Sequence, residues 1–209
     1  MSSDSEIKIT VLGESSVGKT NLINVATGGT FSAETFTSSN GSYKEGSYTA
    51  NNGKIYSFHL WDTVGQEKYR SLNKIFIQDS KIIIFVYAIN DESSFKELNY
   101  WIDLVKNNLG EEGYVAGILA NKNDLYENQV VKDEDGKNYA KSKGYKFKVT
   151  SALCEPIGFK CFLEELIEDY IKIANPIGKD SDNKNDKNTF TLWPWRSNEK
   201  NKNKKKECC

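Results

Sequence analysis

The alternation of strand and helix patterns along this chain predicts an α/β fold with a mostly parallel sheet. The segment Ile82–Tyr87 is an unbroken apolar run, which is typical of a central strand covered on both faces. Upstream of it, Tyr56, Phe58 and Leu60 occupy every second position, so that strand is expected to bury one face only. Segments with apolar residues at helical spacing separate such strands, as expected where helices connect parallel strands.

Local signals place the remaining elements. Asn90 and Asp91 can cap a helix whose apolar positions recur at helical spacing and stop near Gly110, and Pro176 ends the last helix. The other expected strands lie at Ile7–Leu12, Tyr114–Ala120 and Phe147–Thr150, and the other expected helices at Lys19–Ala26, Asp133–Lys143 and Ile157–Ala174.

The length of 209 residues fits one domain, residues 1–176, followed by a polar tail, residues 177–209. The tail holds nine basic and five acidic residues, so its charge is +4, and the formal net charge of −1 then leaves the domain near −5. This acidic balance argues against a nucleic acid polymer as the main partner of the domain. The tail composition by itself is also that of a solvated, disordered linker.

Targeting signals for export are not visible. Met1–Glu6 is polar and acidic rather than the start of an apolar signal-peptide core. The longest apolar run, Ile82–Ile89, is far too short to span a bilayer. Four irregularly placed cysteines do not form a disulfide framework. We therefore expect a protein that is made in the cytosol and stays on the cytosolic side of any membrane.

A phosphate-binding motif, Gly13-x4-Gly18-Lys19-Thr20, stands between an expected strand and an expected helix. The two glycines let the backbone curl so that successive N–H groups face one concavity. The helix that begins at Lys19 adds the positive end of its dipole. Lys19 supplies a charge for the β- and γ-phosphates, and the Thr20 hydroxyl can bind Mg²⁺. The other candidate phosphate-binding residues are Ser15, Ser16 and Val17.

A second motif, Trp61-Asp62-Thr63-Val64-Gly65-Gln66-Glu67, follows the strand that buries one face. Asp62 can hold the Mg²⁺ shell through water. Gly65 can offer its N–H to a γ-phosphate because no side chain blocks a close approach of the backbone. The Gln66 amide can both donate and accept, which is the chemistry needed to orient an attacking water.

A third and a fourth segment can distinguish guanine from adenine. In Asn121-Lys122-Asn123-Asp124, the Asp124 carboxylate can accept hydrogen bonds from the N1–H and 2-amino groups of guanine, which adenine does not offer. The Lys122 stem can lie along the base, and Ser151-Ala152 can bring a backbone N–H to O6. Asn121 completes the segment at the end of an apolar strand.

With these four segments the chain resembles the Ras superfamily of small GTPases and, within it, the Rab family. The likeness extends from Glu6 to Pro176. It is closest in Trp61–Leu72 and in the terminal pair Cys208-Cys209. The resemblance implies a P-loop NTPase fold, the small G domain, with a six-stranded, mostly parallel sheet flanked by five helices. It also implies binding of GTP or GDP with Mg²⁺ and slow hydrolysis of GTP.

The function that the resemblance implies is that of a membrane-anchored switch in vesicular trafficking, which binds effectors in its GTP state. The resemblance implies that Gln66 and Lys19 are the catalytic residues for GTP hydrolysis. Control by a guanine nucleotide exchange factor and a GTPase-activating protein is implied as well. The chain offers no arginine suited to act in cis beside the γ-phosphate, so fast hydrolysis should need the activating protein.

Several positions depart from the family pattern. The first switch, where the family has Thr-Ile-Gly, aligns here with Ser39-Asn40-Gly41. Ser39 keeps a hydroxyl for Mg²⁺ and the γ-phosphate, although Ser38 and Thr37 are close rivals for this role. Leu153 replaces the Lys that commonly follows Ser-Ala, and Ala88 stands where an Asp is usual.

The terminal Cys208-Cys209 resembles the Rab double-prenylation signal. Two lipids would give the two anchors that stable membrane binding requires, and Lys200–Lys206 can add attraction to anionic lipid. Leu192–Trp195 is an apolar island that can dock on an escort protein, dip into the interface, or pack against the domain. The resemblance thus implies a monomer that cycles between cytosol and an endomembrane or the plasma membrane, with a prenylation escort and a GDP-dissociation inhibitor as partners.

Two other functions compete with this interpretation. A binding scaffold that holds nucleotide but barely hydrolyses it is favoured by the altered first switch and disfavoured by the intact Gln66. A phosphotransferase with the same phosphate loop would need an acceptor domain and an Arg-rich lid, and no such insertion lies between Thr20 and Asn121.

Overall fold

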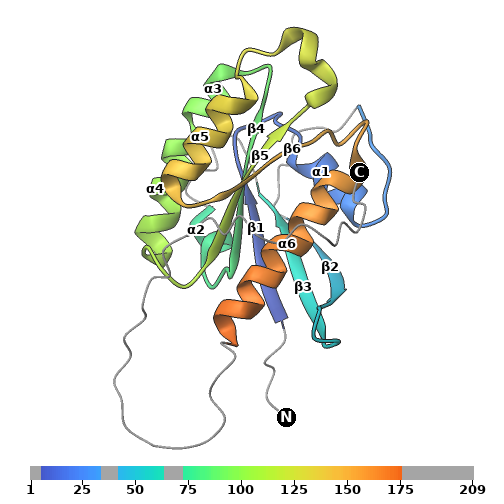
Figure 1. Ribbon diagram of the computed structural model, residues 1–209, viewed down its shortest axis with the longest axis vertical. Coiled ribbons are helices and arrows are strands. Elements are labelled where there is room, and N and C mark those ends of the chain that lie inside the picture. Colours follow the sequence, from blue (N-terminus) through green and yellow to red (C-terminus); the bar gives the residue numbers. More distant parts are fainter. Residues whose placement is uncertain (1–5, 34–41, 64–72, 176–209) are drawn as a thin grey trace, which may run out of the picture.

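A mixed sheet forms the centre of the molecule in the computed structural model, which describes residues 6–33, 42–63 and 73–175. Six strands follow the order β2-β3-β1-β4-β5-β6, and only the β2–β3 pair is antiparallel. This confirms the predicted α/β class with a mostly parallel sheet (Figure 1). The strands are β1 (Glu6–Leu12), β2 (Ser42–Thr49), β3 (Ile55–Asp62), β4 (Ile82–Ala88), β5 (Val115–Asn121) and β6 (Lys146–Val149).

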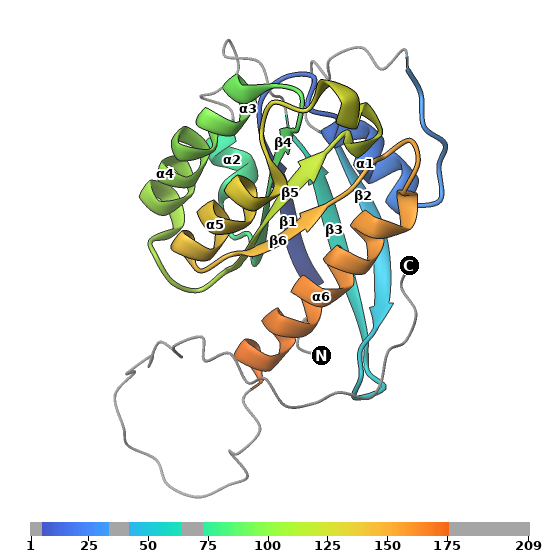
Figure 2. The same cartoon turned by 45° about the horizontal axis from the view of Figure 1, so that its top comes forward.

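Helices cover both faces of this sheet (Figure 2). One layer consists of α1 (Lys19–Ala26) and α6 (Pro156–Ala174), whose apolar residues join one core cluster. The second core cluster lies on the opposite face. The helices in that layer are α2 (Asn73–Ile77), α3 (Glu92–Lys96), α4 (Leu98–Leu109) and α5 (Asp133–Lys143).

Burial along the strands follows the predicted patterns. Every residue of β4 is buried, as expected of a strand between two helical layers. In β3 the residues at Tyr56, Phe58 and Leu60 are buried, whereas their neighbours are exposed or half-buried. The difference fixes which face of β3 looks toward α1 and α6.

The helix expected after Asn90 is recorded as two adjoining helices, α3 and α4, separated at Glu97. The Asp91 side chain caps α3 by accepting from the N–H groups of Ser93 and Ser94. Hydrogen bonds four residues apart still continue through Glu97, whose N–H donates to the Ser93 carbonyl. The five helices implied by the family resemblance are therefore found if α3 and α4 are counted as one and the short 3₁₀ turn η2 (Asn123–Asn128) is set aside.

The edge strand β2 has no burial pattern of its own, because its first four residues are all exposed. Pairing with β3 stabilises this strand, in a register that places Tyr43 opposite Trp61 and Thr49 opposite Ile55. The hairpin turn between them has Gly53 in the left-handed region, at a φ of 79°. Asn52-Gly53-Lys54 thus forms the turn of this hairpin.

The last helix, α6, starts with Pro156 at its first turn and has 19 residues. Among the residues that the structure describes, no helix is both long and apolar enough to cross a membrane. The predicted boundary at residue 176 and the whole tail, 177–209, lie outside the described residues, so this division stays a prediction.

Candidate nucleotide-binding site

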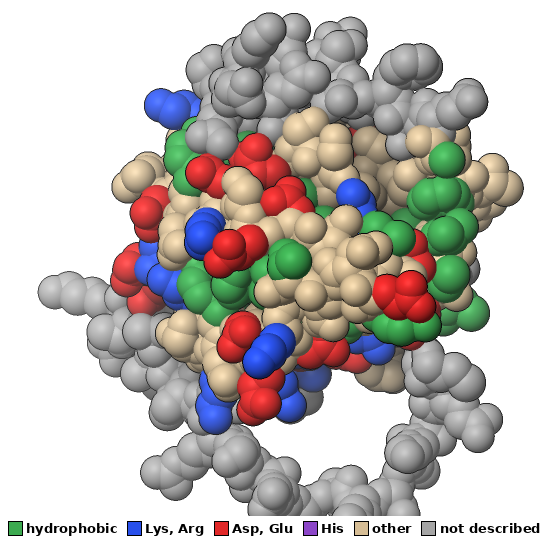
Figure 3. Space-filling model, turned by 90° about the horizontal axis from the view of Figure 1, so that it is seen from above, with side chains coloured by type: hydrophobic (Ala, Val, Ile, Leu, Met, Phe, Trp, Pro, Cys, Tyr) green, Lys and Arg blue, Asp and Glu red, His purple; other side chains and the backbone are tan. Residues whose placement is uncertain are grey.

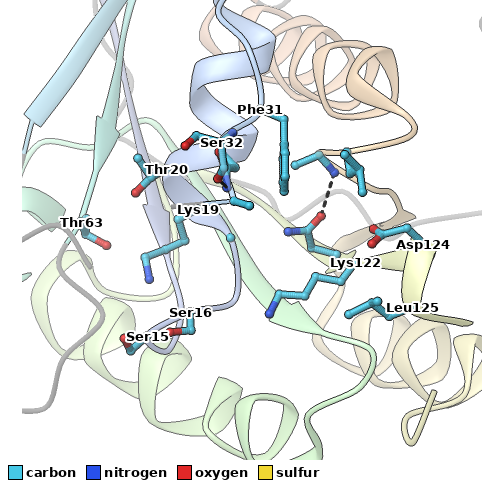
Figure 4. Close-up of a pocket in the computed structure, with 16 residues that line it drawn as sticks. Ser15, Ser16, Lys19, Thr20, Phe31, Ser32, Thr63, Lys122, Asp124 and Leu125 are labelled. Carbon is cyan, nitrogen blue, oxygen red and sulfur yellow. Dashed lines mark hydrogen bonds between the residues drawn. The ribbon is translucent and has the colours of Figure 1, made fainter. Parts of the chain in front are cut away.

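A cavity of about 390 Å³ opens at the edge of the sheet where β1, β3, β5 and β6 end (Figure 4). Loops that follow these strands meet there, as is usual for ligand sites in parallel sheets. The cavity is lined by Ser15, Ser16, Gly18, Lys19, Thr20, Asn21, Phe31, Ser32, Ala33, Thr63, Asn121, Lys122, Asp124, Leu125, Ala152 and Leu153.

The loop between β1 and α1 is held in a shape that requires its two glycines. A Cβ on Gly13 would lie 2.2 Å from the carbonyl oxygen of Val86 in the central strand. A Cβ on Gly18, whose φ is 97°, would lie 2.4 Å from the Asn121 Nδ2. Ser16 is also left-handed, at a φ of 63°. The backbone therefore wraps tightly around one end of the cavity.

The ammonium of Lys19 lies inside this loop. Its Nζ donates to the carbonyl oxygens of Gly13 at 2.8 Å and Glu14 at 2.7 Å, and the residue is only 6% exposed. Burial lowers the pKa of Lys19 to about 8, against the opposing attraction of Asp62 and Glu14. A desolvated cation of this kind gains strongly from an anion placed in the cavity.

The hydroxyl of Thr20 donates to the Asp62 carboxylate, with 2.7 Å between Oγ1 and Oδ2. Asp62 ends β3 and is 3% exposed. The next residue, Thr63, donates its hydroxyl to the Val11 carbonyl at 2.6 Å and so fixes the end of β3 against β1. A hydroxyl and a carboxylate side by side are hard oxygen donors of the kind that Mg²⁺ prefers.

The opposite end of the cavity is organised by Asn121, at the end of β5. Its Nδ2 donates to the Val17 carbonyl at 2.7 Å, and its Oδ1 accepts from the Ala152 N–H at 3.3 Å. The side chain is 1% exposed. Asn121 thereby connects the loop between β1 and α1 to the loop after β6. The Ala152 N–H, one of the two backbone N–H groups expected near O6, already donates to Asn121.

The carboxylate of Asp124 is held in place by Ser151. The Ser151 hydroxyl donates to Asp124 Oδ1 and accepts from the N–H groups of Leu153 at 3.1 Å and Cys154 at 3.0 Å. With its proton committed to Asp124, this hydroxyl fixes one carboxylate oxygen. The other remains available to two donors on one edge of a bound ring.

Lys122 adopts a left-handed conformation at a φ of 66°, which turns its side chain along the cavity. Figure 4 shows Lys122, Asp124 and Leu125 together at one end and Ser15, Ser16, Lys19 and Thr20 at the other.

The structure thus brings nine of the sequence-predicted residues to one cavity: Ser15, Ser16, Gly18, Lys19, Thr20, Asn121, Lys122, Asp124 and Ala152. Gly13, Val17, Asp62 and Ser151 lie immediately behind this lining and shape it through the contacts given above. Five predicted residues lie outside the described ranges: Ser39, Gly65, Gln66, Cys208 and Cys209.

Sequence reasoning did not assign Asn21, Phe31, Ser32, Ala33 or Leu125 to the site, although all of them line it. Phe31 is 38% exposed, and Figure 4 shows its ring pointing into the cavity on the side of Lys122. The available signal was a single aromatic residue in a polar, glycine-rich loop. No periodic pattern singles out the others, because Ser32 and Ala33 come from a loop, Asn21 is a buried polar position of α1, and Leu125 is half-buried in η2.

Acidic and basic side chains are interspersed on the face that carries the strand ends (Figure 3). Within the described part of this face, neither sign of charge gathers into a continuous patch. Selectivity for an anion at this edge must therefore come from the loop and from Lys19 rather than from the overall field.

A strand, a tight glycine loop and a helix that starts at the cavity together define the P-loop class of nucleotide-binding folds. Comparison with known proteins agrees with this class, because the Ras family pattern matches residues 8–172 of the chain. The chain belongs to the Ras family and is a divergent, Rab-like member of it.

Similar proteins include Ras-related protein Rab-21 of Geodia cydonium, 37% identical over 69% of this chain and 62% of its own length. Ras-related protein Rab-26 of Mus musculus is 33% identical over 71% of this chain and 57% of its own length. Ras-related protein Rab-18 of Caenorhabditis elegans is 32% identical over 79% of this chain and 80% of its own length. The chain therefore spans less than two thirds of the length of the first two relatives.

Proposed function

We propose that the protein is a molecular switch that binds GTP or GDP with Mg²⁺, hydrolyses GTP slowly, and regulates membrane trafficking from a lipid-anchored position. The observation that carries this proposal is the pairing, within one cavity, of the Lys19 loop at one end with the Ser151-held Asp124 carboxylate at the other. A triphosphate suits the first end and a guanine ring suits the second.

At the phosphate end, Lys19 would exchange its bonds to the Gly13 and Glu14 carbonyls for phosphate oxygens. The buried ammonium and the start of α1 favour an anion at this place. Thr20 would hold Mg²⁺ directly and Asp62 would hold it through water, since their oxygens already adjoin at 2.7 Å. When bound, Mg²⁺ neutralises charge that develops on the phosphates.

At the base end, one oxygen of Asp124 is fixed by Ser151, and the other would accept from the N1–H and 2-amino groups of guanine. The Lys122 stem and the Phe31 ring would cover the faces of the ring. An adenine ring would leave this second oxygen without donors, which costs about 1–3 kcal/mol or more for a charged group.

For the chemical step, Gln66 would orient a water molecule for in-line attack on the γ-phosphorus, with Lys19 stabilising the charge. Ser39 would contact Mg²⁺ and the γ-phosphate, and Gly65 would donate its N–H to that phosphate. These three roles rest on the sequence and the family resemblance. Hydrolysis would release the first switch and the segment that holds Gly65 and Gln66, which would be the second switch, and so end effector binding.

An aromatic surface beside both switch segments supports effector binding. Tyr43, 47% exposed, packs on Trp61 with ring centroids 4.8 Å apart, and Trp61 packs on Phe76 at 5.7 Å. Residues 34–41 lead directly into β2, and residues 64–72 connect β3 to α2. A change in either segment would therefore reach this cluster, which fits an apolar partner surface. Trp61 itself is half-buried rather than exposed, because Tyr43 and Phe76 flank it.

The remaining partners belong to the same proposal. An exchange factor would open the nucleotide site, and an activating protein would speed hydrolysis. Cys208 and Cys209 would carry the prenyl groups, which an escort protein delivers and a GDP-dissociation inhibitor covers. The protein would then cycle, as a monomer, between cytosol and the cytosolic face of an endomembrane or the plasma membrane.

Calorimetric titration of the nucleotide-free protein with GDP, GTP and ATP in Mg²⁺ tests the assignment of the site. We expect tight binding of both guanine nucleotides and at least about a hundredfold weaker binding of ATP, because two missing donors at the half-buried Asp124 carboxylate cost several kcal/mol. Asp124→Asn should weaken the binding of guanine nucleotides and strengthen the binding of xanthine nucleotides, whose C2 carbonyl accepts a hydrogen bond from the new amide. Equal affinity of the protein for ATP and GTP would refute the assignment.

A nucleotide-holding scaffold is the second candidate, and the altered first switch, Ser39-Asn40-Gly41, favours it. Such a protein would pass the binding test above with no measurable hydrolysis. Single-turnover measurements therefore separate the two candidates.

A further inference from the structure

A buried asparagine in the first helix holds the loop that carries Phe31. Asn21 is the third residue of α1 and is 6% exposed. Its Nδ2 donates to the Ser32 carbonyl at 2.9 Å, and its Oδ1 accepts from the Ser32 N–H at 3.1 Å. One side-chain amide thus binds both backbone groups of a single loop residue.

We call these two hydrogen bonds the Asn21 clamp. The helix α1 does not need them for its own formation. Asparagine is a weak helix former, because its side chain competes for backbone groups. A buried amide also has to be satisfied by hydrogen bonds, which here come from a segment eleven residues further along the chain. The residue therefore serves the loop rather than the helix.

The loop begins directly after α1 and leaves the helix through two glycines. After α1 the chain turns at Gly28, with a φ of 84°, and the Gly29 N–H donates to the Asn24 carbonyl. Beyond Gly29, residues 30–33 belong to no helix or strand, and Phe31 and Ser32 are both exposed. The clamp at Ser32 fixes the residue directly next to Phe31.

We propose that Asn21 is a positioning residue for nucleotide retention: by clamping the Ser32 backbone, it holds the Phe31 ring over the base end of the cavity. Figure 4 shows Ser32 and Phe31 adjacent, with the Phe31 ring directed toward Lys122 and Asp124. Without the clamp the ring spends less time over the base, so the base leaves faster. This inference rests on the proposed function, because it requires a bound guanine nucleotide.

Dissociation of a fluorescent GDP analogue, chased with excess GDP in Mg²⁺, tests the clamp. We expect Asn21→Ala to release the analogue about tenfold faster, since it removes two hydrogen bonds of ordinary strength. Asn21→Asp should fall between it and the wild type, because the carboxylate keeps the acceptor for the Ser32 N–H and loses the donor. Asn24→Ala is the matched control, since Asn24 lies on the same helix and takes no part in the clamp; it should change release by less than about twofold.

A double-mutant cycle distinguishes positioning from a general loss of structure. In a Phe31→Ala background, Asn21→Ala should accelerate release by less than about twofold, because there is no ring left to hold. Wild-type release rates in Asn21→Ala, or the same tenfold effect with and without Phe31, would overturn the inference. Failure of the wild-type protein to bind the GDP analogue at all would instead refute the proposed function.

Discussion

Single residues decide the site through contacts that residue types alone do not reveal. The motifs identify Lys19 and Asp124 as candidates, because an ammonium suits phosphate and a carboxylate suits guanine, and Asn121 belongs to the same motif as Asp124. That Asn121 bridges two loops, and that Ser151 fixes Asp124, depends on residues far apart in the sequence. Spacing predicts which residues converge, whereas the hydrogen bonds among them require the fold.

Gly13→Ala should be among the most destabilising single substitutions in the chain. The new Cβ would lie 2.2 Å from the Val86 carbonyl oxygen, a backbone atom of the buried central strand that cannot move aside. We expect a loss of more than about 3 kcal/mol in the free energy of unfolding, measured by urea denaturation, or failure to fold.

Gly28→Ala separates this contact from backbone strain. Gly28 also has a positive φ, 84°, but a Cβ there would meet no atom within 4 Å. Its substitution should cost only about 1 kcal/mol, the strain of a left-handed alanine. Similar losses in both variants would mean that the close approach of Gly13 to β4 is not what requires glycine.

Among the elements, those with strong patterns were predictable and those that depend on neighbours were not. The ranges predicted for α1 and α5 agree with the structure, because a phosphate loop before one and clear end signals around the other mark their limits. The strand β2 and the short helix α2 lack such signals, since β2 is held by pairing with β3 and α2 by packing Ile77 into the second core cluster. Tertiary contacts specify these elements.

One contact between elements ties the β2–β3 hairpin to α6. Glu168 Oε1 accepts from the Tyr48 hydroxyl at 2.9 Å and from the Asn51 N–H at 2.8 Å. Burial acts to raise the pKa of Glu168, but the hydrogen bonds from Asn51 and Tyr48, together with the charge of Lys172, outweigh it and hold the pKa below its ordinary value of 4.5. Burial, with the bond to Glu168, raises the pKa of Tyr48 to about 12.

The contribution of Glu168 to the free energy of unfolding should therefore depend on pH. Because its pKa is lower in the folded state, its contribution is present above pH 4.5 and is lost as the pH falls through the folded-state pKa. Glu168→Gln should lower the free energy of unfolding by less than about 1 kcal/mol at pH 7, since the group is partly solvated. The difference in free energy of unfolding between this variant and the wild type, measured by denaturation, should disappear below pH 4.5.

Glu164→Gln, one turn earlier on α6, is the control for this effect, because neither hydrogen bond to the hairpin involves Glu164. It should show no comparable narrowing with pH. A wild-type advantage over Glu168→Gln that stayed constant from pH 7 to below 4.5 would contradict the role given to the carboxylate.

At the scale of the whole molecule, the fold places the nucleotide cavity and the end of α6 at different ends of the domain (Figure 1). The helix α6 therefore ends away from the cavity, which suits the proposed switch, whose tail would anchor it while its site stays open to regulators. The fold of the domain could be predicted because each of the four motifs follows a strand, and the loops after parallel strands meet at one edge of the sheet. The tail has no such pattern, so its role rests on composition and on the terminal cysteines alone.

Replacing Cys208 and Cys209 together by serine should move the protein from the membrane to the soluble fraction of cells. A single replacement should weaken attachment less, since one lipid still gives reversible binding. Fractionation of cells that express each variant measures this, with Cys154→Ser, an exposed cysteine of the domain, as the control. Persistent membrane association of the double variant would contradict the lipid anchor.

The central claim, that this chain is a working GTP switch, is tested most directly by single-turnover hydrolysis. Purified protein loaded with GTP and Mg²⁺ should convert it slowly to GDP, and Gln66→Leu should suppress this conversion, because the leucine cannot orient the attacking water. Tight GTP binding with no hydrolysis by the wild type would contradict the claim and favour the scaffold, directing attention to Ser39 and Asn40.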